Sequence, residues 1–166
     1  MKPILFIDRD GTIIKEPADF QIDSLDKLDF MPGVFRWLGR ICREFDYYQV
    51  MVTNQDGLGT PSFPEESFRE PHSILLKALK AEGIEFDEIL IDRSLPSEKL
   101  PTRKPGIGMV EHLLNGNFDV TNSYVIGDRE TDELFAANIG CRAIRFGTNA
   151  TMRNNLTALS WEDVYN

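Results

Sequence analysis

Cysteine and long hydrophobic runs are both scarce in this sequence. Its 166 residues include two cysteines, Cys42 and Cys141, which lie far apart and form no metal-ligand spacing. No stretch approaches the ~20 apolar residues of a membrane helix, and charges interrupt the apolar run at residues 3–7 before it reaches the length of a signal-peptide core. The sequence therefore predicts reduced thiols, a cytoplasmic location and no membrane partner.

Positive charge is also in short supply. Lys and Arg number 18 against 27 Asp and Glu, which gives a formal net charge of -9. Such a surplus repels polyanions, so nucleic acid is not expected as a partner. A small anionic substrate can still bind where cations gather locally. The length suits one domain, so we expect residues 1–166 to form a single folding unit.

Short apolar runs alternate with segments of helical periodicity along the chain. The predicted strands are residues 3–7, 48–53, 87–91, 123–127 and 142–146. The predicted helices are residues 34–45, 68–79 with Pro71 breaking the helix or delaying its start, 109–114, and 134–139 closed by Gly140. This alternation predicts an α/β, three-layer, Rossmann-like fold with a mainly parallel sheet, whose ligands bind beyond the carboxyl ends of the strands.

Two carboxylates follow the first predicted strand. Asp8 and Asp10 are two residues apart, so in an extended conformation they point to the same side while Arg9 points away. Gly11 permits a sharp turn after them. Carboxylates in proximity raise each other's pKa, and a cation would relieve this.

Groups that can hold an anion follow the second predicted strand and precede the third predicted helix. Thr53 and Asn54 offer a hydroxyl and an amide after the second strand, ahead of a glycine-rich stretch. Arg103 and Lys104 precede a proline suited to the first position of the predicted helix at 109–114, where the helix dipole favours anions.

Two further carboxylates, Asp128 and Asp132, follow the fourth predicted strand and share one face if a helix begins there. Taken singly, each of these groups has an ordinary alternative as a solvated pair, a turn, a surface patch or a helix cap. Because all of them fall at the same edge of one sheet, together they predict a Mg²⁺ site beside a phosphate cradle.

The segments DRDGT, VTN, RKP and GDRETD, spread in this order over about three quarters of the chain, resemble the four motifs of the haloacid dehalogenase superfamily of phosphotransferases. The resemblance implies the fold of that superfamily without a large cap domain. It implies that Asp8 is the nucleophile that forms an aspartyl-phosphate. Asp10 would protonate the leaving oxygen and then activate water.

The same resemblance assigns the metal and phosphate ligands. Mg²⁺ would be held by Asp8, the backbone carbonyl of Asp10 and Asp128, with Asp132 in support. The phosphoryl oxygens would be held by Thr53, Asn54 and Lys104.

Finer features resemble the histidinol-phosphate phosphatases of histidine biosynthesis: FIDRDGT, TNQDGLGT followed by SFP, and the Pro-His pair at 71–72. The alternatives are a phosphatase of the same superfamily acting on a sugar phosphate such as heptose bisphosphate, and a catalytically silent binding module. Relatives that act on polynucleotides are disfavoured by the acidic charge. Some bacteria fuse such a phosphatase ahead of an imidazoleglycerol-phosphate dehydratase domain, so this fusion is a possible context for the chain.

The substrate rim is expected in the loops at 15–31 and 54–72. Its candidate residues are Glu16, Gln55, Asp56 and Arg103. Glu16 or Asp56 would meet the cationic end of histidinol phosphate, and Phe20 or Phe63 would cover its ring. His72 is expected to be structural.

One departure from the resemblance concerns the loop before RKP, where related phosphatases usually carry a zinc clamp of three cysteines and one histidine. The corresponding positions here are Asp92, Ser94, Leu100 and Thr102, which cannot form such a site. Zinc is therefore not expected.

Overall fold

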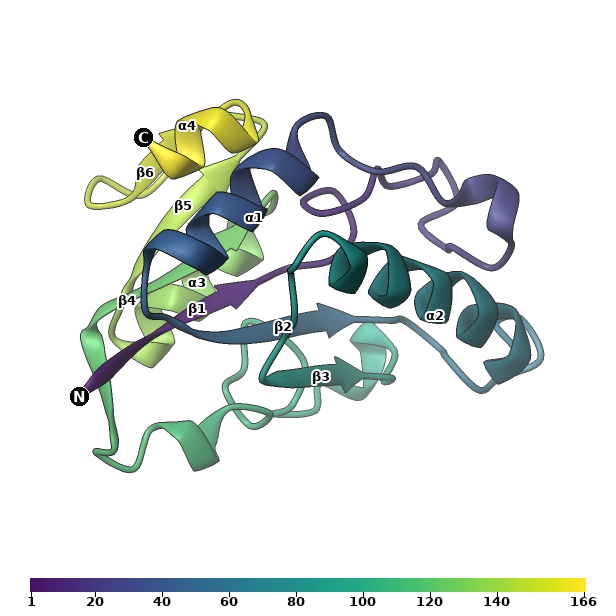
Figure 1. Cartoon of the computed structure of the whole chain (residues 1–166). Helices are drawn as coiled ribbons and strands as arrows, with labels where there is room; N and C mark the ends of the chain where they lie inside the picture. Colours follow the sequence, from purple (N-terminus) through teal and green to yellow (C-terminus); the bar gives the residue numbers. More distant parts are fainter.

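The computed structural model describes all 166 residues, and its six strands form one parallel sheet (Figure 1). The strands are β1 (Lys2–Ile7), β2 (Tyr48–Asn54), β3 (Glu88–Asp92), β4 (Phe118–Gly127), β5 (Arg142–Phe146) and β6 (Leu156–Ala158). Their order is β3-β2-β1-β4-β5-β6, and every neighbouring pair is parallel. The predicted parallel α/β architecture is confirmed.

Helices cover both faces of the sheet (Figure 1). They are α1 (Val34–Glu44), α2 (Glu65–Ala81), α3 (Glu130–Ile139) and α4 (Trp161–Tyr165). Alternation along β1 sends Leu5 and Ile7 into the core cluster shared with α1, α2 and α4, whereas Ile4 and Phe6 pack in the cluster shared with α3. The sheet is therefore the middle of three layers.

Pro71 lies inside α2, contrary to the prediction that it would break the helix or delay its start. The helix begins at Glu65 and continues through Pro71, whose own side chain is buried. Leu75 and Leu79, further along the same helix, are also fully buried. Packing of this apolar face offsets the hydrogen bond that proline cannot donate.

The helix predicted at 109–114 is absent and is replaced by a 3₁₀ turn at Glu111–Leu113. Val110 and Leu113 are buried against the same face as α3, so their apolar spacing reflects burial rather than a helix. The preceding segment folds in turns, with the Gly108 N–H donating to the Pro101 carbonyl at 2.9 Å. Lys104 consequently sits in a loop with no helix dipole behind it.

The chain after β5 contains two short elements that sequence periodicity did not predict, β6 and α4. Trp161 anchors α4: its side chain is fully buried, and its Nε1 donates to the Thr12 carbonyl at 2.9 Å.

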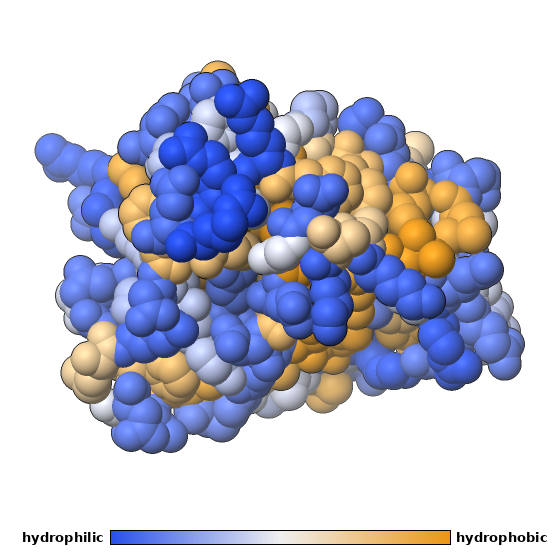
Figure 2. All heavy atoms as spheres, viewed as in Figure 1, coloured by the Kyte–Doolittle hydropathy of each residue, from blue (hydrophilic) through white to orange (hydrophobic).

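The face formed by α1 and α2 is mostly hydrophilic, with hydrophobic side chains visible across its middle (Figure 2). No helix of the structure is long and apolar enough to cross a membrane.

Candidate active site

The candidate site lies where the strand order reverses, between β1 and β4 at the centre of the sheet. Ile7 of β1 is paired with Ile126 of β4, and the Asp8 N–H donates to the Ile126 carbonyl at 2.9 Å. Asp8 and Asp128 therefore leave adjacent strands at the same edge, where an open parallel sheet forms its ligand crevice.

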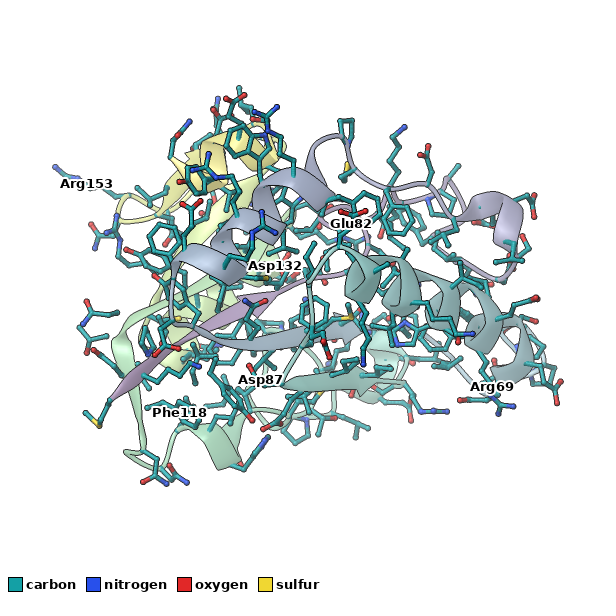
Figure 3. All side chains as sticks on the ribbon, in the orientation of Figure 1. Arg69, Glu82, Asp87, Phe118, Asp132 and Arg153 are labelled. Carbon is teal, nitrogen blue, oxygen red and sulfur yellow. The ribbon has the colours of Figure 1, made fainter.

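Three carboxylates meet at this edge. Asp8, Asp128 and Asp132 each offer an oxygen, and these atoms all lie within 4.8 Å of one another. Asp132 is buried and lies near the centre of the view in Figure 3, whereas Arg69 and Arg153 lie toward opposite edges. The structure thus joins three of the predicted acidic residues.

Two glycines make room for these carboxylates. A Cβ at Gly11 would lie 2.2 Å from Asp128 Oδ2, and one at Gly127 would lie 2.3 Å from Asp132 Cγ. Gly11 also has φ +82°, a backbone conformation that favours glycine. Any larger residue at either position would displace a carboxylate.

Lys104 bridges two of the carboxylates. Its buried Nζ donates to Asp8 Oδ1 and to Asp132 Oδ1, each at 2.8 Å. Asn54 holds the lysine loop from β2: its Nδ2 donates to the Lys104 carbonyl at 3.2 Å, and its Oδ1 accepts from the Lys104 N–H at 3.1 Å. The Asn54 side chain, predicted to hold phosphate, is here engaged in placing Lys104.

Burial and mutual repulsion shift the pKa values of the cluster. Burial raises the pKa of Asp8 well above its ordinary value; Lys104 opposes this, and Asp132 and Asp128 add to it. Burial likewise raises the pKa of Asp128, with Asp132 adding to the effect. Burial lowers the pKa of Lys104, but Asp132 and Asp8 outweigh it, so the lysine pKa is raised and the ammonium stays charged. The single Lys104 ammonium cannot neutralise three carboxylates.

These residues fit a hard divalent cation. Asp128 Oδ1 is buried and has no hydrogen-bond partner. An orphaned buried oxygen is costly, and an all-oxygen donor set suits magnesium. Asp8 and Asp128 are therefore suited to act as carboxylate ligands of a magnesium ion.

The Asp10 carboxylate lies outside this cluster, because donors hold both of its oxygens elsewhere. Arg9 Nε donates to Oδ1 at 2.8 Å, and Gln55 Nε2 donates to Oδ2 at 2.9 Å and to Thr53 Oγ1 at 2.9 Å. The carboxylates that raise the pKa of Asp8 are Asp132 and Asp128, whereas the sequence had indicated Asp10. Arg9 is buried as expected of a residue pointing away, yet its guanidinium returns to Asp10, which no sequence pattern indicated.

Ion pairs line the rim of the crevice, whose volume is about 870 Å³. Arg129 Nη2 meets Glu16 Oε1 at 2.5 Å, and Arg103 pairs with Asp56. Both acids that were predicted to meet a cationic substrate therefore already have an arginine partner. Arg129 itself was not predicted.

The two candidate aromatic residues differ in exposure. Phe20 is 65% exposed, with the Arg129 Cζ 5.5 Å from the centre of its ring. Phe63 is 1% exposed and packs edge-on against Phe68. Phe20 is available to a ligand, whereas Phe63 belongs to the core.

The loop in which a zinc clamp was not expected is held by hydrogen bonds to the buried Asp92. Asp92 Oδ1 accepts from the Ser94 N–H at 2.9 Å and the Ser94 hydroxyl at 2.5 Å, and Oδ2 accepts from the Thr102 hydroxyl at 2.6 Å. Leu100 takes no part and is 44% exposed. We call Asp92, Ser94 and Thr102 the Asp92 clamp.

A second buried carboxylate, Glu133, organises the far side of the site. It accepts from Arg145 Nη1 at 2.5 Å, from the Thr151 hydroxyl at 2.8 Å and from Asn155 Nδ2 at 3.1 Å. Arg145 Nε in turn donates to the Asp128 carbonyl at 2.9 Å. Glu133 thus links the loop before β6 to the backbone of Asp128, a role that the sequence did not reveal.

The sequence is similar to known proteins over different parts of its length. Residues 101–165 match a family model described as "HAD-hyrolase-like". The chain is 58% identical over 145 residues to the histidine biosynthesis bifunctional protein HisB of Bacteroides fragilis strain YCH46, covering 86% of this chain and 39% of that protein. It is 46% identical over 165 residues to HisB of Spirosoma linguale, covering 99% of this chain and 42% of that protein. The chain thus spans about two fifths of these relatives.

Solved structures share the fold. The D,D-heptose 1,7-bisphosphate phosphatase from B. bronchiseptica, complexed with magnesium and phosphate, superimposes with a TM-score of 0.86 at 24% identity, covering 99% of this chain and 96% of that one. The corresponding phosphatase from Burkholderia thailandensis gives a TM-score of 0.70 at 19% identity, with 99% and 96% coverage.

Proposed function

Because the chain belongs to the haloacid dehalogenase superfamily, we propose that it is a magnesium-dependent phosphatase that hydrolyses L-histidinol phosphate to L-histidinol and phosphate. The observation that carries the phosphatase activity is the buried Asp8–Lys104–Asp132 arrangement beside Asp128. The high identity to proteins named for histidine biosynthesis supports the choice of substrate.

The reaction proceeds in two transfers. An Asp8 carboxylate oxygen attacks phosphorus, the ester P–O bond breaks, and Asp10 gives its proton to the leaving oxygen. Asp10 then takes a proton from water as the water oxygen attacks phosphorus. The bond between phosphorus and Asp8 breaks, phosphate leaves, and Asp10 is protonated again.

The remaining residues bind and orient the phosphoryl group. Lys104 and Thr53 face the crevice and would hold phosphoryl oxygens, while Asn54 acts through the lysine loop. When bound by Asp8, Asp128 and the Asp10 carbonyl, Mg²⁺ supplies positive charge that offsets the carboxylates and the phosphoryl oxygens. Asp132 supports this arrangement by holding Lys104.

Recognition of the rest of the substrate falls to the rim. Histidinol phosphate carries an ammonium and an imidazole. The ammonium would compete with Arg129 for Glu16 or with Arg103 for Asp56. The exposed ring of Phe20 offers a surface on which the imidazole can stack.

The test is a phosphate-release assay with histidinol phosphate and heptose bisphosphate, each with and without Mg²⁺. We expect Mg²⁺-dependent turnover with a clear preference for histidinol phosphate. Asp8→Asn should abolish turnover while circular dichroism shows an intact fold. If the chain prefers heptose bisphosphate, that ester replaces histidinol phosphate as the proposed substrate. If it hydrolyses neither ester, the result favours a silent binding module.

Two broader proposals accompany this one. The relatives are named bifunctional and are longer than this chain, which supports a context in which the phosphatase is joined to an imidazoleglycerol-phosphate dehydratase domain. We also assign it to the cytoplasm, where amino-acid biosynthesis takes place. Cell fractionation and detection of the full-length protein with an antibody would test both.

A further inference from the structure

Arg9 is the charged side chain of the site to which no role has yet been given. It is 0% exposed, and a guanidinium remains charged in proteins. Burying such a charge is unfavourable unless it is paired. Its carboxylate partner is Asp10, whose Oδ1 accepts from Arg9 Nε at 2.8 Å.

Two residues of α2 hold the guanidinium in place. Its Cζ lies 4.8 Å from the centre of the Phe68 ring, and its Nη1 lies 3.0 Å from His72 Nδ1. The His72 and Phe68 rings are themselves stacked, 4.7 Å apart and inclined by 22°.

The contact between Arg9 and His72 fixes the state of the imidazole. A guanidinium can only donate, so His72 Nδ1 accepts and the ring carries its proton on Nε2. Burial and the charge of Arg9 lower the pKa of His72 to about 4, against a smaller opposite effect of Asp10. His72 therefore remains an acceptor at neutral pH.

We propose that Arg9, held by Phe68 and His72, is a positioning residue that fixes the Asp10 carboxylate for proton transfer to the leaving oxygen. Arg9 and Gln55 bind one carboxylate oxygen each, and each oxygen keeps a further lone pair that can carry the proton. Through this contact α2 influences the reaction without touching the substrate. The inference rests on the proposed phosphatase activity.

The leaving group distinguishes this role from general support of the fold. An alkoxide such as that of histidinol is a poor leaving group and requires the proton, whereas p-nitrophenolate leaves without one. The ratio kcat/KM includes only the steps up to formation of the aspartyl-phosphate. Loss of Arg9 should therefore lower kcat/KM for the alkyl ester far more than for the aryl ester.

The experiment compares Arg9→Lys and His72→Phe with the wild-type chain on histidinol phosphate and p-nitrophenyl phosphate. For Arg9→Lys we expect kcat/KM to fall about 100-fold on histidinol phosphate, the order contributed by acid catalysis, and by no more than about threefold on the aryl ester. His72→Phe keeps the stack on Phe68 but removes the acceptor of the Arg9 hydrogen bond. It should therefore also lower kcat/KM more on histidinol phosphate than on p-nitrophenyl phosphate, with smaller losses than Arg9→Lys.

A matched control is Arg40→Lys. Arg40 also lies over an aromatic ring, with its Cζ 4.2 Å from the Tyr165 ring centre, and also pairs with a carboxylate, at 2.8 Å from Glu44. It sits on α1, away from the crevice, so neither ratio should change.

Equal losses on both esters would overturn the positioning role of Arg9 while leaving the phosphatase activity intact. A wild-type chain that hydrolyses neither ester would overturn both proposals. If circular dichroism shows that Arg9→Lys does not fold, His72→Phe decides the outcome alone.

Discussion

At the scale of single residues, Gly11 combines a positive φ with a position at which an added Cβ would collide with Asp128. Gly11→Ala should lower activity by at least about 100-fold, because displacement of Asp128 by about 1 Å misplaces the reacting groups. It should also lower the free energy of unfolding by more than the ~1–2 kcal/mol that φ alone would cost. Phosphate-release kinetics and urea denaturation measure the two effects.

Gly116→Ala is the matched control for this substitution. Gly116 has φ +88°, but no atom lies within 4 Å of the place that an alanine methyl group would take. The variant should therefore lose stability through its backbone and keep full activity. If Gly11→Ala were as active as Gly116→Ala, contact between the added methyl group and Asp128 would not affect the reaction.

At this scale the residue types predicted the chemistry of the site better than they predicted its side-chain contacts. The positions of Asp8 and Asp128 after strands predicted their meeting, because strand ends share one edge of a parallel sheet. Lys104 was expected at the same edge from a predicted helix start, but it reaches the site from a loop.

The partners of Asn54 and Arg9 were not predictable. Asn54 binds the backbone of Lys104, which is distant in sequence. Arg9, in contrast, turns back to its neighbour Asp10 and also meets the distant His72. Both outcomes depend on the directions in which the Asn54 and Arg9 side chains point. Such directions are set by packing, which a single sequence does not encode locally.

At the scale of elements, the link between α3 and the loop before β6 depends on the charge of Glu133. Burial raises the pKa of Glu133, but hydrogen bonds from Asn155, Met152 and Thr151 outweigh it and lower the pKa to about 2 from its ordinary 4.5. The folded state thus prefers the ionised form. Stability from this group is complete above pH 4.5 and is lost as the pH falls toward 2.

We therefore expect Glu133→Gln to destabilise the protein by about 3 kcal/mol at pH 7, the value that corresponds to this pKa difference. The gap between wild type and variant should narrow as the pH falls below 4.5, as measured by urea denaturation at several pH values. Glu130→Gln, at an exposed position of the same helix, should cause little change at any pH. A gap independent of pH would mean that shape, rather than charge, holds the loop.

The limits of periodicity also appear at the scale of elements. Residues 109–114 have helical spacing of apolar side chains, yet the turns that include Gly106 and Gly108 leave only one 3₁₀ turn. Pro71 had the opposite outcome, because burial of one face of α2 maintained the helix through it. Local signals were overridden in both cases by packing against the sheet.

At the scale of the whole molecule, we propose that residues 1–166 fold as one cooperative unit. Trp161 near the carboxyl end shares a core cluster with Leu5 of β1 and Val34 of α1. In Trp37→Phe, Trp161 remains as the only tryptophan, and its fluorescence should change in the same urea transition as the far-ultraviolet circular dichroism. An earlier fluorescence transition would show that α4 unfolds separately.

The sheet as a whole was the most predictable feature. Five of its six strands were predicted from short apolar runs, because strands buried on both faces need such runs. β6 was missed because it has three residues, and only Ala158 among them is buried.

The Asp92 clamp has a consequence for the conditions that the protein tolerates. The loop from Asp92 to Pro105, which presents Lys104 to Asp8, is held by a carboxylate and two hydroxyls and contains neither cysteine nor methionine. Peroxide therefore has no sulfur atom to oxidise in this loop. The loop also contains no thiolate ligand whose oxidation would free the loop from its anchor. The lysine on which the candidate site depends is presented by a loop whose shape is insensitive to redox state.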